Sequence, residues 1–260
     1  MRPARPADGP RVPLIEVARA ARGVATGANA FFLFGRARFD ASGIDEGRFV
    51  RVIARARDAQ RLVLTADDLE ALERRGRPTH LLALRRDVRP AGALADHLAE
   101  GERLGLHEKP LLSRRRPWWT TEARDAPAIL FTYLSRGVPR FVLNEAKAAA
   151  LTTFLTVRPA PPPADVSAED WAVCLVAALN GPGTLASLAD HARSYGGRTR
   201  KIEPRELERV ELPALTRLPA ATLTELAVRA RTWLGAASLP ERQAAAAEWE
   251  AEVLRRLGRT

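Results

Sequence analysis

The chain has 260 residues, of which 46% are hydrophobic and 28% are charged, and this balance is that of a folded protein rather than a disordered one. Its formal net charge of +10 comes almost wholly from arginine and favours polyanionic partners. The single cysteine, Cys174, excludes an internal disulfide, and no apolar run is long enough to span a bilayer. We therefore expect a cytoplasmic protein without a membrane partner.

The first part of the chain predicts a mixed body. Residues 1–11 hold three prolines, three arginines and little to bury, and we expect a flexible basic arm. Residues 12–160 should form a mixed α/β subdomain, with helices beginning at Thr65 and covering 91–104. Strands are predicted at 31–34, 79–84, 128–134, 140–143 and 152–157, and the segments 128–134 and 140–143 should pair as a hairpin.

A proline run at 159–163 separates this body from a more helical part. Residues 165–213 should form a subdomain of helices and a short strand, with one helix from Ser167 to Asn180 and another over 185–193. Residues 214–260 read as C-terminal helices split near Leu239 and Pro240, which pack on the body or on a partner helix. The fold class is therefore α+β, a mixed β-containing domain with a helical C-terminal part.

A glycine-containing loop follows the first arginine-rich segment, with the sequence Arg22-Gly-Val-Ala-Thr-Gly-Ala-Asn29. Thr26 and Asn29 can offer hydrogen bonds from such a loop, and the glycines allow close backbone approach. The loop could alternatively cradle the anionic part of a nucleotide or cofactor, although the second glycine is not followed by the Lys and Ser/Thr of a phosphate loop.

Three further segments combine arginine with polar or aromatic residues. Phosphate contact is expected of Arg114, Arg115 and Arg116, while Trp118 and its neighbour Trp119 either stack on bases or pack in the core. Arg136 and Arg140 belong to the predicted hairpin and can face a groove, and Asn144 can read adenine or cap a following alanine-rich helix. Arg198, Arg200 and Lys201 can reach phosphates from an exposed strand, or form a charged edge strand.

These segments resemble the target-recognition region of adenine-specific DNA methyltransferases of restriction–modification type. In that family the first motif reads roughly Arg-Gly-hydrophobic-x-Thr-Gly-x-Asn-x-Phe-Phe, and Arg22 to Phe32 match it. The Pro-Trp-Trp segment, the hairpin and Gly196-Gly-Arg-Thr-Arg-Lys-Ile-Glu-Pro-Arg-Glu-Leu207 match later motifs. The resemblance covers about residues 12–212 and implies that the chain binds double-stranded DNA and selects its sequence.

Two parts of such an enzyme are not found in this sequence. One is the glycine-rich turn that binds S-adenosylmethionine, and the other is the Asn/Asp-Pro-Pro-Tyr/Phe segment that holds the flipped base. We therefore expect no catalytic residue, cofactor or metal in this chain, and a catalytic methyltransferase domain or subunit elsewhere. The alternatives are a small-ligand or nucleotide-binding enzyme that uses the loop at 23–29, and a helical interaction module for a methyltransferase.

Overall fold

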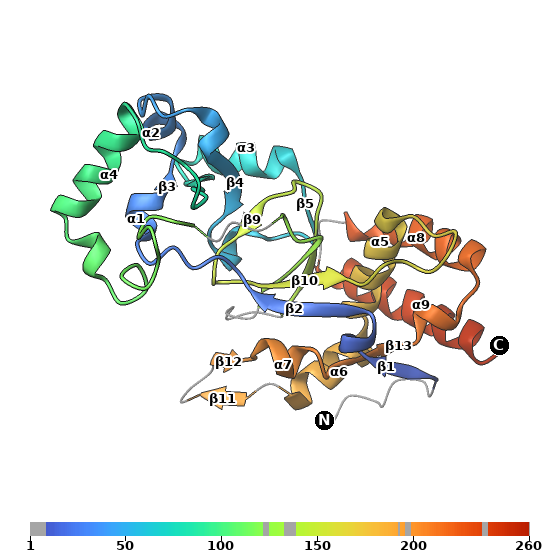
Figure 1. The fold of residues 1–260 in the computed structure, drawn as a ribbon. Coiled ribbons are helices and arrows are strands. Elements are labelled where there is room, and N and C mark those ends of the chain that lie inside the picture. Colours follow the sequence, from blue (N-terminus) through green and yellow to red (C-terminus); the bar gives the residue numbers. More distant parts are fainter. Residues whose placement is uncertain are drawn as a thin grey trace.

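The computed structural model describes residues 9–121, 125–132, 139–191, 193–195, 199–235 and 239–259; at 193–195, 199–201 and 239 it describes the backbone alone. The fold is α+β, as the sequence predicts. In Figure 1 the helices α5, α8 and α9 gather on one side of the central strands, and α1, α2 and α4 gather on the other.

The central sheet has five strands, and its two faces are both covered. In order across the sheet they are β2 (Ala18–Arg22), β10 (Leu155–Pro159), β7 (Ile129–Phe131), β8 (Phe141–Asn144) and β5 (Val63–Leu64). All neighbours are antiparallel except β5 and β8. Ile129 and Phe131 enter one hydrophobic cluster while Leu130 enters another, because successive side chains point to opposite faces. The predicted hairpin pairing is confirmed, with β7 antiparallel to β8.

A second, four-stranded sheet carries the aromatic cluster of the N-terminal half. Its strands are β3 (Leu33–Phe34), β6 (His80–Leu82), β4 (Phe49–Ile53) and β9 (Ala149–Ala150). The helices of this half are α1 (Asn29–Phe32), α2 (Arg36–Asp40), α3 (Ala66–Arg74) and α4 (Ala93–Arg103). The predicted strand at 31–34 is wrong in its first half, since α1 is a single helical turn that directs Phe31 and Phe32 into the cluster.

Helix α3 begins where the sequence predicts, because its cap is local. Thr65 accepts a hydrogen bond from the Asp68 amide, and Asp68 accepts one from the Thr65 amide, so both form a capping box. Leu69 and Leu72 of this helix are buried in the cluster that contains Leu130. Helix α3 therefore belongs to the hydrophobic cluster that covers one face of the central sheet.

The C-terminal half is mainly helical. Its elements are α5 (Ala168–Leu179), α6 (Pro182–His191), β11 (Arg193–Tyr195), β12 (Thr199–Lys201), α7 (Pro204–Leu207), β13 (Glu211–Pro213), α8 (Ala220–Leu234) and α9 (Leu239–Leu257). Among the described residues no single helix has the length and apolarity of a membrane span; α5 and α6 reach them only as a pair bent by 67°.

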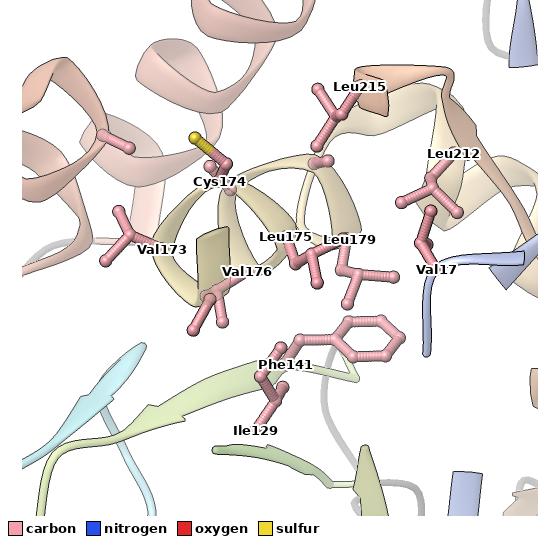
Figure 2. Packing of buried hydrophobic residues seen from close by; sticks show 14 of the residues in the cluster. Val17, Ile129, Phe141, Val173, Cys174, Leu175, Val176, Leu179, Leu212 and Leu215 are labelled. Carbon is pink, nitrogen blue, oxygen red and sulfur yellow. The ribbon is translucent and has the colours of Figure 1, made fainter. Parts of the chain in front are cut away.

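Helix α5 is the centre of the largest hydrophobic cluster. Figure 2 shows Val176 and Leu179 of this helix facing Phe141 and Ile129 of the sheet. Cys174 is fully buried on α5, its Sγ lies 3.3 Å from the carbonyl oxygen of Leu223, and burial raises its pKa to about 12. A thiol so poorly ionised is inert, so Cys174 acts as a small residue of the core.

The first strand of the chain joins the last part of the fold. β1 (Arg11–Pro13) pairs antiparallel with β13, and the Arg11 guanidinium lies 2.8 Å from Oε1 of Glu250 in α9. The Glu250 side chain is 2% exposed and its other oxygen accepts from the Gly183 amide. Arg11 therefore does not belong to a flexible arm, because a strand partner and a buried carboxylate fix it. The proposed division into residues 12–160, 165–213 and 214–260 stays a prediction.

Candidate nucleic-acid interface

Backbone amides of the loop at 23–28 donate to acceptors within the protein and so fix the loop. The Gly23 amide donates to the Phe154 carbonyl at 3.2 Å and the Val24 amide donates to the Ala150 carbonyl at 2.7 Å. The Ala28 amide donates to Oγ1 of Thr26 at 3.2 Å. An anion cradle needs amides that point at the ligand, and these three already have acceptors within the protein. The geometry therefore gives no support to the nucleotide-loop alternative.

The polar side chains of this loop serve it locally. Thr26 is 2% exposed, and its hydroxyl donates to Oδ1 of Asn29, the first residue of α1. Asn29 itself is exposed. Of the two predicted DNA contacts, Thr26 is thus buried, and only Asn29 stands at the surface.

Arg115 joins the second motif to the first. Its guanidinium donates to the carbonyl oxygens of Ala25 at 2.6 Å and Thr26 at 3.4 Å. Trp118 packs on the residues that follow the loop, with ring centroids 5.7 Å from Phe31 and 6.4 Å from Phe32. Two motifs separated by more than eighty residues in sequence therefore lie side by side.

Trp118 is a core residue rather than a free stacking surface. It is 9% exposed, and its indole N–H donates to Oε1 of Glu102 at 3.1 Å. Trp119 is 7% exposed in the same cluster. The packing alternative therefore describes both rings, and the burial of Trp118 argues against base stacking. Arg114 and Arg116 are exposed beside them.

Arg22 connects the loop to the later Lys-Ile-Glu-Pro-Arg-Glu-Leu motif. Its guanidinium lies 2.6 Å from Oε2 of Glu203, and the backbone amide of Glu203 donates to Oε2 of Glu206 at 2.9 Å. The backbone amide of Ala20 donates to Oε1 of Glu208 at 3.0 Å. Three of the four motifs that carry the family resemblance thus form one connected region of the fold.

A hollow of about 340 Å³ opens beside this region and is lined by residues of β2, β9 and β10. Arg22, Thr152, Thr156 and Arg158 line it together with the backbone at Gly23. Arg158 also donates to the carbonyl oxygen of Asp125. The hollow is thus bordered by two cationic side chains and two hydroxyls, which suit phosphate oxygens, and also by the acidic residue Asp125, which does not.

Asn144 is structural. It is 6% exposed, its Nδ2 donates to the carbonyls of Pro127 at 2.7 Å and Ala148 at 2.9 Å, and its Oδ1 accepts from the Ala148 amide at 3.1 Å. No helix follows it, because the chain continues into β9, so the predicted helix cap is wrong. With both polar atoms occupied inside the fold, adenine reading by Asn144 is disfavoured as well.

The remaining predicted contacts fall into three groups. Arg140 is half-buried, and its guanidinium donates to the Ala59 carbonyl at 3.0 Å rather than facing an open groove. Arg136 and Arg198 lie outside the described residues. Arg200 and Lys201 lie in β12, which pairs with β11 as a two-stranded ribbon. The strand predicted at 198–202 is confirmed over Thr199–Lys201.

One basic segment escaped the sequence-based prediction. Arg55, Arg57 and Arg61 are all exposed on the loop between β4 and β5. Its single acid, Asp58, is paired with Arg77 at 3.3 Å. The close spacing of three arginines along seven residues was the signal that could have found it.

The family model described as "Type II methyltransferase M.Eco57I, C-terminal domain" matches residues 7–239 of this chain. The chain therefore belongs to that family. The match confirms the resemblance at the level of a C-terminal region of Type II methyltransferases.

Relatives of this kind are longer than the present chain. It is 26% identical over 215 residues to Type II methyltransferase M.AccI of Acinetobacter calcoaceticus, covering 83% of this chain and 39% of the relative. It is 28% identical over 221 residues to Type II methyltransferase M.XamI of Xanthomonas campestris pv. amaranthicola, covering 85% and 40%. The chain thus spans about two fifths of the length of these relatives.

The fold also has a counterpart among solved structures. The crystal structure of the type IIG restriction endonuclease BpuSI superposes with a TM-score of 0.52 and 13% identity, covering 95% of this chain and 31% of that chain. At this level of identity the similarity concerns the fold alone.

Proposed function

We propose that this chain is the DNA target-recognition region of an adenine-specific methyltransferase. In this role it binds duplex DNA and supplies sequence specificity to a catalytic domain located elsewhere, which binds S-adenosylmethionine. The observation that carries the proposal is the family match over 7–239, because it assigns the chain to the C-terminal region of methyltransferases. The net charge of +10 supports a polyanionic partner.

The division of labour in this proposal follows from the kinds of side chains at the surface. Exposed arginines such as Arg114 and Arg116 can neutralise phosphates and set the register on the duplex. Sequence reading then falls to polar side chains at the same surface, of which Asn29 is exposed next to the motif loop.

Binding to a labelled duplex across a salt series tests the first half of the proposal. Neutralising several phosphates should lower the affinity by orders of magnitude between about 50 and 200 mM salt. Selection from a pool of random duplexes tests the second half, and we expect enrichment of one short site that contains a fixed adenine. Binding that ignores salt, or selection that enriches nothing, would contradict the proposal.

Incubation with DNA and radiolabelled S-adenosylmethionine tests the separate location of catalysis. We expect no transfer by this chain alone. Transfer by the purified chain would show that the catalytic groups are present here.

A further inference from the structure

Two arginines, one half-buried and one buried, lie where the central sheet meets the helical part. Arg140 directly precedes β8, and Arg242 of α9 is 8% exposed. Arg140 donates to the Ala59 carbonyl at 3.0 Å, and Arg242 donates to the Gln60 carbonyl at 3.3 Å. Both guanidinium groups therefore donate to backbone carbonyls of the basic loop between β4 and β5. Two like charges held in a site with little water repel each other, and this repulsion costs free energy.

The electrostatics of the two arginines agree with this cost. Burial lowers the pKa of Arg140 below its ordinary value, and the charge of Arg242 acts in the same direction. Burial also lowers the pKa of Arg242, with Arg61 as the second cause. Arg242 thus lies within electrostatic reach of both Arg140 and Arg61.

A small cavity lies against these side chains. Its volume is about 40 Å³, and Arg140, Arg242 and Trp233 line it with Leu62 and Asn180. The Nε of Arg140 and the Nε1 of Trp233 are buried and donate to no acceptor among the described residues. Trp233 itself is 8% exposed. Buried donors of this kind normally have an acceptor, so an accepting oxygen, of a water or of a ligand, is expected in the cavity.

The chemistry of the lining favours a phosphate group as that ligand. None of the described residues that line the cavity is acidic. A water needs roughly 10–15 Å³ by this measure of volume, so 40 Å³ admits a group with two or three oxygens. Arginine donors suit phosphate oxygens in geometry as well as in charge. The exposed arginines at 55, 57 and 61 extend the positive surface outward, as an extended polyanion requires.

We propose that the cavity between Arg140, Arg242 and Trp233 is a phosphate pocket that takes a backbone phosphate of duplex DNA. The proposal rests on the function proposed above, since it names one place where the DNA is held. Inorganic phosphate has the same chemistry and is the other source of the group, so the experiment includes both.

Tryptophan labelled with ¹⁵N in the full chain gives a direct readout. The chain has five tryptophans, and Trp233→Phe assigns the indole N–H resonance of Trp233 by its loss. We expect this resonance to move on titration with duplex DNA, because its N–H gains a phosphate acceptor. Trp171 and Trp249 are internal controls, since their indole N–H groups already donate to Ala160 at 3.2 Å and to Leu226 at 3.0 Å.

The affinity of Trp233→Phe for duplex DNA supplies the second readout. This variant keeps the aromatic ring and all charges, so we expect about ten-fold weaker binding with an unchanged salt slope. The pocket would be overturned if the chain binds DNA while the Trp233 resonance does not move and Trp233→Phe binds as tightly as the wild type. The proposed function would then remain intact. Movement with inorganic phosphate but not with DNA would overturn the DNA source. A wild-type chain that binds no duplex would overturn the proposed function itself.

Discussion

Gly23 shows most directly what the motif loop demands of its residues. A Cβ at this position would lie 2.2 Å from the carbonyl oxygen of Leu151 and 2.6 Å from that of Ala150, both of which are backbone atoms. Gly23→Ala should therefore lower the free energy of unfolding by about 3 kcal/mol, as overpacking against an unyielding backbone does. Urea unfolding measures this change.

Gly235 provides the matched control. It lies at the end of α8 with φ of −77°, and nothing would lie within 4 Å of an added Cβ. Gly235→Ala should change stability by less than about 0.5 kcal/mol. Equal losses in the two variants would show that the close approach at Gly23 is unimportant.

Asn144 is a second residue whose side chain is committed to the fold. Asn144→Ala would leave two buried carbonyls and the Ala148 amide without their partner, and should cost about 1–3 kcal/mol or more. Chemical denaturation checks the loss. DNA affinity measured well below the unfolding midpoint should remain near that of the wild type, and a stable variant with selectively weakened DNA binding would restore Asn144 as a contact.

His97 makes stability depend on pH. It stacks on Phe31 with ring centroids 4.1 Å apart, and burial lowers its pKa below the ordinary value, with the charge of Arg38 acting in the same direction. The unfolded chain therefore takes up a proton near pH 6.5 that the folded chain resists, so stability is lost as the pH falls below about 6.5. Burial lowers the pKa of His80 as well, which adds to the same trend.

Replacing His97 by phenylalanine keeps an aromatic ring and removes this titration. Between pH 7 and pH 5 the free energy of unfolding of His97→Phe should fall less than that of the wild type. Parallel pH profiles in the variant and the wild type would assign the effect to other groups.

At the scale of elements, the loop between β4 and β5 is the clearest candidate for phosphate contact. Substituting Arg55, Arg57 and Arg61 together by glutamine should reduce the slope of log affinity against log salt by up to about 3, since each phosphate neutralised contributes roughly 0.9. Anisotropy of a labelled duplex measures the slope.

The control for this loop removes the same charge from the helical part. Arg209, Arg217 and Arg229 are also exposed, and their triple glutamine variant has the same net charge as the loop variant. We expect its salt slope to stay near the wild-type value. If both variants lose the same slope, general charge explains the binding and the loop has no special role.

Elements with local signals could be predicted from the sequence, and elements defined by distant partners could not. The starts of α3 and α5 follow from Thr65 and Ser167, whose side chains cap the helix within three residues. β1 and β9 hold three and two residues, and each exists only because a strand far along the chain pairs with it. The stretch 31–34 is apolar enough for a strand, but the aromatic cluster selects a helical turn for its first half.

The same distinction between local and distant signals applies to the candidate site. The motifs themselves are visible in the sequence, whereas the contacts of Arg115 with the loop at 25–26 join residues about ninety positions apart. No local pattern tells that Arg22 pairs with Glu203 or that Trp118 is buried. The sequence thus shows the motifs but does not separate the residues that hold this region together from those left at its surface.

At the scale of the whole molecule, the ion pair between Arg11 and Glu250 connects the two ends of the described chain. Arg11→Ala would leave the Glu250 carboxylate buried without its cation, and should lower stability by about 3–5 kcal/mol. Arg22→Ala breaks the ion pair with Glu203, in which the Arg22 side chain is 64% exposed. It should cost about 1 kcal/mol of stability or less. Thermal and urea unfolding of both variants compare the two, and similar losses would contradict the special role of the buried pair.

The pairing of β1 with β13 also determines how the molecule responds to a cut in its backbone. Pro161, Pro162 and Pro163 are at least partly exposed and join the sheet-rich half to the helical half. Yet Val12, Val17 and Ala18 share one hydrophobic cluster with Leu212 and Leu254, so the segment before the cut remains packed within the segment after it. Cleavage by a protease at the proline run would thus produce two polypeptides that co-elute in size-exclusion chromatography and dissociate only in denaturant.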